Sequence, residues 1–228
     1  MICSLFAAIV EHFPLYVDEN RQFLERTTSK NAFRFTIIRD PVEQFVSYWR
    51  VSLQFGKPFN KSIGLRETIA QCWRVHQRIE NGSVPANYDW TYLTTMSDSG
   101  QRTDDETRYL LLTNVQSREL GWSHSRRAAA GFAEAVESFE SSALAYLRTL
   151  DFVGLTSELQ QTWAMLRKAL CWPSKYFQHS EKESKSVRFF ARLSTEQIEQ
   201  IRAFQWADER LYQEAKRLYN ASVANVFS

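Results

Sequence analysis

The sequence predicts an α/β fold in which a short parallel sheet is flanked by many helices. Residues 33–38 and 151–156 are rich in aromatic and β-branched residues, a composition typical of short buried strands. After each strand, apolar residues recur at helical spacing. Strands that alternate with helices favour a parallel sheet, because the helix carries the chain back to the start of the next strand.

Length and composition indicate one soluble globular domain. With 228 residues, 44% of them hydrophobic and 24% charged, the chain can bury a core, and we expect a single domain over residues 1–228. Its net charge of +2 gives no strong field, so we expect no nucleic-acid partner and only local anion binding. No segment has the length of a transmembrane helix. We expect no metal, because no cluster of metal ligands is present and the cysteines are widely spaced, at Cys3, Cys72 and Cys171.

The first predicted strand runs directly into a predicted helix. Asp40 occupies the N-cap position, Pro41 the first helical position and Glu43 the third, which makes a capping box with a proline start. The helix then presents one apolar face to the core, formed by Val42, Phe45, Val46, Trp49 and Leu53. We therefore expect a core-facing helix that begins at Pro41.

The junction between this strand and helix is a candidate anion site. Arg39 stands at the carboxyl end of the strand, where open α/β sheets bind ligands. Ser47 lies off the apolar face of the helix, so its hydroxyl is free to point towards the same region. A guanidinium, a hydroxyl and a helix N-terminus can together bind an anion. The alternative is that Arg39 pairs with a surface carboxylate and Ser47 is solvated.

The remaining elements are predicted from the spacing of apolar residues and from turn and capping residues. An irregular stretch over residues 81–101, with several Gly, Ser and Thr residues, is the longest expected loop. Ser194 and Gln197 form a second capping box at a helix start. The other helices are expected over residues 17–26, 63–79, 106–120 and 128–150, from the second strand to residue 170, and from about residue 207 onwards.

Three motifs resemble those of the sulfotransferases. Residues 36–48 (Thr-Ile-Ile-Arg-Asp-Pro-Val-Glu-Gln-Phe-Val-Ser-Tyr) resemble the 3′-phosphate-binding segment of that family, and are closest to the carbohydrate enzymes of the Golgi type, such as heparan sulfate 2-O-sulfotransferases. Residues 114–121 are similar to their Asn-x-Gln-Thr-Arg-x-Leu-x-Gly segment. Residues 152–156 (Phe-Val-Gly-Leu-Thr) nearly match Phe-x-Val-Gly-Leu-Thr-Glu, but Ser157 replaces the usual Glu and Glu158 comes one residue late.

The resemblance implies a P-loop-NTPase-like sulfotransferase fold and binding of the donor 3′-phosphoadenosine 5′-phosphosulfate (PAPS), with adenosine 3′,5′-bisphosphate as product. Arg39 and Ser47 would then grip the 3′-phosphate. A basic loop closes the nucleotide site in relatives, and its weaker candidates here are Lys182, Lys185 and Arg188. The alternative for these three is a solvated charged face.

The resemblance also implies a catalytic base and an acceptor site. His12 would take the proton from the acceptor hydroxyl, and Glu11, where relatives carry Gly, is a second possible base. The alternative for His12 is a structural role. The expected acceptor is a carbohydrate, bound by Asn114, Gln116 and Arg118 and stacked on Tyr88 and Trp90. The alternatives are a solvated helix end and aromatic residues that pack the loop onto the body.

One family feature is not found in the sequence. Relatives open with a strand and a Lys-containing phosphosulfate loop, whereas only 38 residues precede Arg39 and none of them shows that pattern. We therefore expect an N-terminally truncated or reduced relative, cytoplasmic if bacterial, or in the Golgi lumen if an upstream anchor exists.

The expected function is transfer of a sulfuryl group from PAPS to a carbohydrate hydroxyl. One alternative is a catalytically inactive domain that binds nucleotide or a partner protein. A helical interaction module, the third class, would require both predicted strands to be absent.

Overall fold

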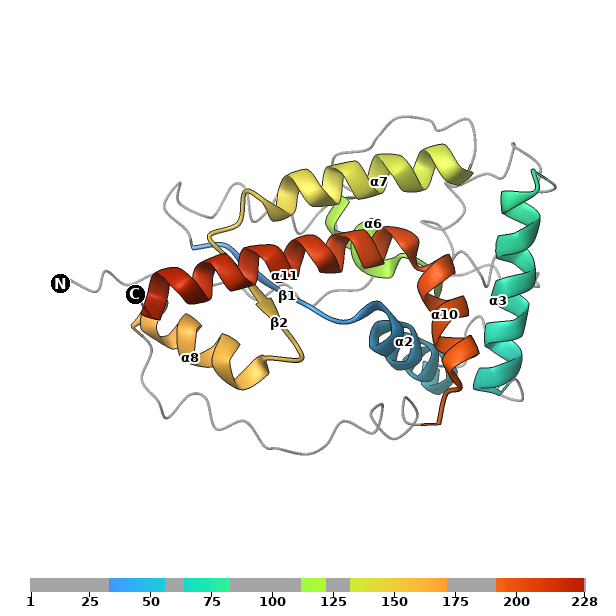
Figure 1. The fold of residues 1–228 in the computed structure, drawn as a ribbon, viewed down its shortest axis with the longest axis horizontal. Coiled ribbons are helices and arrows are strands. Elements are labelled where there is room, and N and C mark those ends of the chain that lie inside the picture. Colours follow the sequence, from blue (N-terminus) through green and yellow to red (C-terminus); the bar gives the residue numbers. More distant parts are fainter. Residues whose placement is uncertain (1–32, 56–63, 83–111, 122–131, 172–191, 228) are drawn as a thin grey trace.

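A computed structural model describes residues 33–55, 64–82, 112–121, 132–171 and 192–227 (Figure 1). Within these ranges the chain forms two strands and seven helices. They are β1 (Phe35–Ile38), α2 (Pro41–Phe55), α3 (Leu65–Glu80), α6 (Val115–Gly121), α7 (Phe132–Leu147), β2 (Phe152–Leu155), α8 (Leu159–Leu170), α10 (Thr195–Phe204) and α11 (Trp206–Phe227). The predicted helix over residues 17–26 and the predicted loop over residues 83–101 lie outside the described residues.

The two predicted strands are confirmed, and they pair in parallel. The register joins Phe35 to Phe152 and Ile38 to Leu155. One further bond, from the Thr156 amide to the Ile38 carbonyl at 3.0 Å, extends the ladder past the end of both strands. Because the strands are parallel, the residues that follow Ile38 and Leu155 lie at the same edge of the sheet. The expected α/β fold class is confirmed, which excludes the purely helical alternative.

The helices bury two apolar clusters, one around α2 and the other around the sheet. One cluster joins α2, α3 and α10, and it holds Phe45, Phe204 and Ile69. The other joins the sheet to α7, α8 and α11, and it holds Leu166 and Leu211. The long helix α11 runs beside both β2 and α7, as Figure 1 shows, so it spans much of the molecule.

Local signals predicted the start of α2 correctly. The helix begins at Pro41, and the Asp40 carboxylate oxygen Oδ1 accepts bonds from the amides of Val42 (2.9 Å) and Glu43 (3.3 Å). The predicted stripe is buried at Val42, Phe45, Val46 and Trp49. Of the capping box predicted at this start, only the half made by the Asp40 carboxylate is present among the described contacts. The second predicted capping box is confirmed in full, because Ser194 and Gln197 exchange bonds in both directions at the start of α10.

The helix predicted over residues 106–120 is confirmed from Val115 onwards but is interrupted just before that residue. Residues 106–111 lie outside the described residues, and the chain leaves helical geometry at Thr113 and Asn114. Helix α6 begins only at Val115, because Asn114 adopts a left-handed backbone with φ of 50°. Asn114 and Gln116 therefore stand at a helix start, whereas the sequence placed them near a helix end.

None of the described helices combines the length and apolar character that crossing a membrane requires.

The second strand packs closely against α8 at Gly154. A Cβ atom there would lie 2.3 Å from the Thr162 methyl carbon and 3.3 Å from Cγ1 of Ile37. The Thr162 hydroxyl is itself fixed, with the amide and the carbonyl of Leu155 each 3.2 Å away. Gly154 is therefore needed for close approach between β2 and α8.

From this contact we predict the effect of one substitution and how a second substitution reduces that effect. Gly154→Ala should lower the free energy of unfolding by about 1–3 kcal/mol, because the new methyl overpacks against Thr162. In a Thr162→Ser background the same substitution should cost less, since the opposing methyl is gone. Urea-denaturation midpoints of the two single variants and the double variant measure both effects. An equal cost in both backgrounds would contradict the packing account.

Candidate functional site

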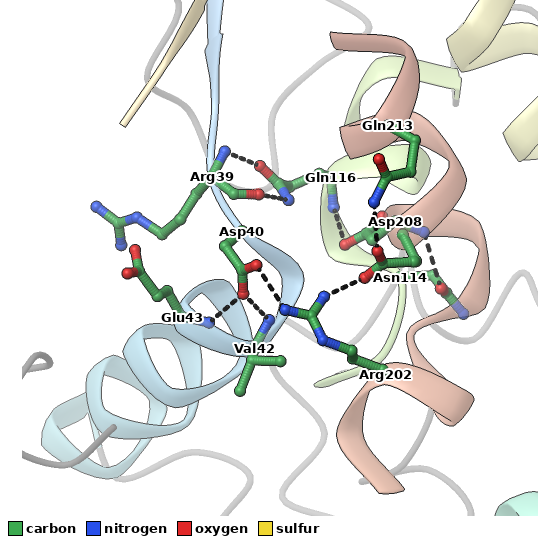
Figure 2. A network of polar contacts seen from close by, with 10 residues as sticks. Arg39, Asp40, Val42, Glu43, Asn114, Gln116, Arg202, Asp208 and Gln213 are labelled. Carbon is green, nitrogen blue, oxygen red and sulfur yellow. Dashed lines mark hydrogen bonds and ion pairs between the residues drawn. The ribbon is translucent and has the colours of Figure 1, made fainter. Parts of the chain in front are cut away.

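Arg39 follows β1 directly, and its peptide groups are held by a side chain from α6. The Arg39 amide donates to Oε1 of Gln116 at 2.9 Å, and Nε2 of Gln116 donates back to the Arg39 carbonyl at 2.9 Å. Figure 2 shows the two bonds side by side. A strand neighbour would offer the same donor and acceptor, so the Gln116 amide acts on Arg39 as an added strand would.

Gln116 is in turn held by Asp208 of α11. The backbone amides of Gln116 and Ser117 donate to the two carboxylate oxygens of Asp208, at 3.1 Å and 2.7 Å. Asp208 is fully buried, and burial raises the pKa of its carboxyl group, an effect opposed by these bonds and by the nearby charge of Arg118. The carboxylate satisfies two amides that the start of α6 would otherwise leave without partners.

Asn114 in turn caps the start of α11. Its Oδ1 accepts from the amides of Ala207 (3.0 Å) and Asp208 (3.3 Å), in the first turn of that helix. Its own amide donates to Oε1 of Gln205 at 2.5 Å. An asparagine tolerates the left-handed backbone that this arrangement needs better than most residues do. The N-termini of α6 and α11 therefore cap each other.

A second polar bridge fixes the start of α2. Oδ2 of Asp40 pairs with Nη2 of Arg202 from α10 at 2.9 Å, while Oδ1 of the same carboxylate caps α2. Arg202 also pairs with Glu209 of α11. The residue after Arg39 is thus tied to two helices far along the chain, and the α2 amides that might have met an anion are already occupied.

The guanidinium of Arg39 is left available. The side chain is half-buried, and among the described residues the guanidinium has no hydrogen-bond or ion-pair partner. In Figure 2 it points away from Gln116, on the side where the Glu43 carboxylate also lies. Burial raises the pKa of Glu43, the charge of Asp40 raises it further, and the charge of Arg39 opposes both.

Ser47 lies one turn beyond Glu43 on α2 and is half-buried. Within the described part of the chain its hydroxyl has no hydrogen-bond partner. The structure therefore places Arg39 and Ser47 on the same strand-to-helix unit, with both polar groups available. For Arg39, the carboxylate partner of the alternative interpretation is not found among the described residues. For Ser47, a hydroxyl without a partner agrees with both interpretations.

The three residues expected to bind the acceptor have structural contacts. The side-chain amides of Asn114 and Gln116 are buried and bonded to backbone groups of the protein. Arg118 is half-buried, and its charge acts on Asp208. Contact of these side chains with an acceptor stays a prediction. The other predicted site residues lie outside the described part of the chain: Glu11, His12, Tyr88, Trp90, Lys182, Lys185 and Arg188.

Ser157, where the sequence departs from the Phe-x-Val-Gly-Leu-Thr-Glu motif, lies just after β2. Ser157, in place of the expected Glu, is hydrogen-bonded with Tyr212 of α11. Burial raises the pKa of the Tyr212 hydroxyl, which the Ser157 bond opposes and the charges of Asp40 and Glu43 reinforce. Among the described residues, no group of His, Cys, Asp and Glu is arranged to hold a metal ion.

The double role of Asp40 can be separated by two substitutions. Asp40→Asn keeps a capping oxygen but removes the charge that pairs with Arg202, so it should cost only the roughly 0.2–1 kcal/mol of a partly exposed ion pair. Asp40→Ala removes the cap as well and should cost about 1 kcal/mol more. Urea denaturation measures both, and the Asp40→Asn effect should shrink at high salt. Equal losses for the two variants would show that the cap contributes nothing.

Comparison with known proteins places these contacts in a family. The sequence model of the Sulfotransferase family matches residues 8–213, which is most of the chain and includes Arg39, Gln116 and Asp208. No match was found among curated proteins or among solved structures. The small parallel sheet with its surrounding helices agrees with an α/β sulfotransferase fold. The chain belongs to the sulfotransferase family.

Proposed function

We propose that the chain is a single domain that transfers a sulfuryl group from PAPS to a hydroxyl of a carbohydrate acceptor. The observation that carries the proposal is the available guanidinium of Arg39, on a backbone fixed at the carboxyl end of β1. Ser47 supplies a hydroxyl on the same unit. The family match supports sulfuryl transfer, whereas PAPS, the carbohydrate acceptor and the Golgi-type specificity are the proposed part.

Recognition of the 3′-phosphate rests on side chains. Asp40 already accepts the amides of Val42 and Glu43, so the start of α2 does not offer these two donors to a ligand. The guanidinium of Arg39 can instead donate two parallel bonds to phosphate oxygens. The half-buried position of both Arg39 and Ser47 strengthens such bonds, because water competes less with them.

The chemistry we propose is an in-line transfer. The acceptor oxygen forms a bond to sulfur while the bond between sulfur and the bridging phosphate oxygen breaks. His12 takes the acceptor proton, with Glu11 as a second candidate base, and adenosine 3′,5′-bisphosphate leaves. Fixed cations would stabilise the charge on the leaving phosphate. Lys182, Lys185 and Arg188 are weaker candidates for closing the nucleotide site over the 3′-phosphate. Tyr88 and Trp90 would stack on the acceptor sugar, and Arg118 would donate to it.

Nucleotide binding tests the role of Arg39. Adenosine 3′,5′-bisphosphate should bind more tightly than 5′-AMP by calorimetric titration, and Arg39→Ala should weaken the bisphosphate about tenfold to a hundredfold, the worth of a charge-assisted bond. Arg34→Ala is the matched control, because Arg34 lies at the opposite end of β1 and contacts Asp151 and Thr149. Equal binding of the two nucleotides, or equal losses in both variants, would remove Arg39 from the site.

Turnover separates the enzyme from an inactive binding domain. The wild-type chain should transfer labelled sulfate from PAPS to at least one member of a panel of polysaccharides, and His12→Ala should lower kcat about 10²–10⁴-fold, the usual contribution of a general base. The affinity for adenosine 3′,5′-bisphosphate should stay within twofold in that variant. Bisphosphate binding without transfer to any carbohydrate would favour the inactive alternative.

A further inference from the structure

We propose that Gln116 is a positioning residue for the anion site, and that it aims the Arg39 guanidinium by holding the Arg39 peptide. The inference rests on the proposed function, because it concerns how the same site recognises the 3′-phosphate. It gives Gln116 a role other than contact with the acceptor.

The bonding pattern around the Gln116 amide is complete and directional. Its oxygen faces the Arg39 amide and its nitrogen faces the Arg39 carbonyl, both at 2.9 Å. Rotating the amide by half a turn would set donor against donor and acceptor against acceptor, so one orientation alone satisfies both contacts. Only 8% of the residue is exposed, which limits competition from water.

Arg39 needs such a partner because the hydrogen bonds between the two strands end before this residue. The last ladder bond runs from the Thr156 amide to the Ile38 carbonyl, and in the described structure Arg39 takes no backbone bond from β2. Arg39 therefore sits between the last paired residue of the strand and Pro41, the first residue of α2. Without the two Gln116 bonds, the Arg39 peptide would turn more freely, and its guanidinium would turn with it.

The position of Gln116 is itself fixed by contacts with α11. Its backbone amide and that of Ser117 bind the buried carboxylate of Asp208, and Asn114 caps the helix that carries Asp208. The chain of contacts thus runs from the N-terminus of α11 through α6 to the Arg39 peptide (Figure 2). A phosphate that binds two guanidinium donors in parallel depends on their orientation, so holding the peptide lowers the cost of binding.

The test compares two nucleotides across matched variants. Gln116→Met keeps the length of the side chain but removes both bonds to Arg39. We expect the affinity ratio between adenosine 3′,5′-bisphosphate and 5′-AMP to fall about tenfold, with 5′-AMP binding within twofold of wild type, because only orientation at the 3′-phosphate is lost. Gln71→Met is the control, since among the described residues the Gln71 side chain bonds only Glu67, on the surface of α3.

A second substitution shows whether the effect passes through Arg39. In an Arg39→Ala background, Gln116→Met should change bisphosphate affinity less than twofold, because the group it positions is already absent. Should Gln116→Met fail to fold, Gln116→Asn carries the test, since it retains the buried amide but is one methylene too short to reach both peptide atoms.

Three outcomes would overturn the inference. Unchanged affinities for both nucleotides in Gln116→Met would show that Arg39 is aimed without Gln116. Equal loss of both nucleotides would indicate a general structural role. An effect of the same size with and without Arg39 would indicate direct contact of Gln116 with the ligand. If the wild-type chain did not distinguish the two nucleotides, the proposed function would fail first, and this inference with it.

Discussion

The mutual capping of α6 and α11 is the constraint on which the rest of the site depends. Asp208 binds the first amides of α6, and Asn114 binds the first amides of α11. Both side chains are buried, so either helix start would lose partners that water could not replace if the other moved. The pair therefore acts as one unit, and Gln116 projects from it to the end of β1.

Next to this unit, the guanidinium of Arg39 has no ion-pair partner among the described residues. Asp40 is occupied by the amides of α2 and by Arg202, and Arg202 is shared with Glu209. The guanidinium of Arg39 and the carboxylate of Glu43 are the charged groups there without a hydrogen-bond or ion-pair partner among the described residues. An orienting bond to the Arg39 backbone and an unpaired guanidinium are what a preorganised anion site requires. This geometry therefore supports the location that we propose for the nucleotide phosphate.

Short-range signals predicted the fold well, and long-range contacts explain what was missed. The strand before Arg39 and the caps at Asp40 and Ser194 depend on neighbours within a few residues, so the sequence pattern reveals them. The break at Asn114 depends on Gln205 and Asp208, far along the chain, and the local signal for it is weak, namely the preference of asparagine for left-handed and helix-capping positions. For the same reason the sequence did not reveal that α11 and β1 engage the polar residues at the start of α6, whose contact with an acceptor stays a prediction.

The most direct test of the central claim is a crystal structure of the chain with adenosine 3′,5′-bisphosphate. The account predicts that oxygens of the 3′-phosphate lie about 2.7–2.9 Å from the guanidinium nitrogens of Arg39, the range of charge-assisted bonds. It also predicts that the Ser47 hydroxyl contacts the same phosphate and that the two bonds from Gln116 to the Arg39 peptide are intact. A nucleotide bound elsewhere, with the Arg39 guanidinium turned to Glu43 or to solvent, would contradict it.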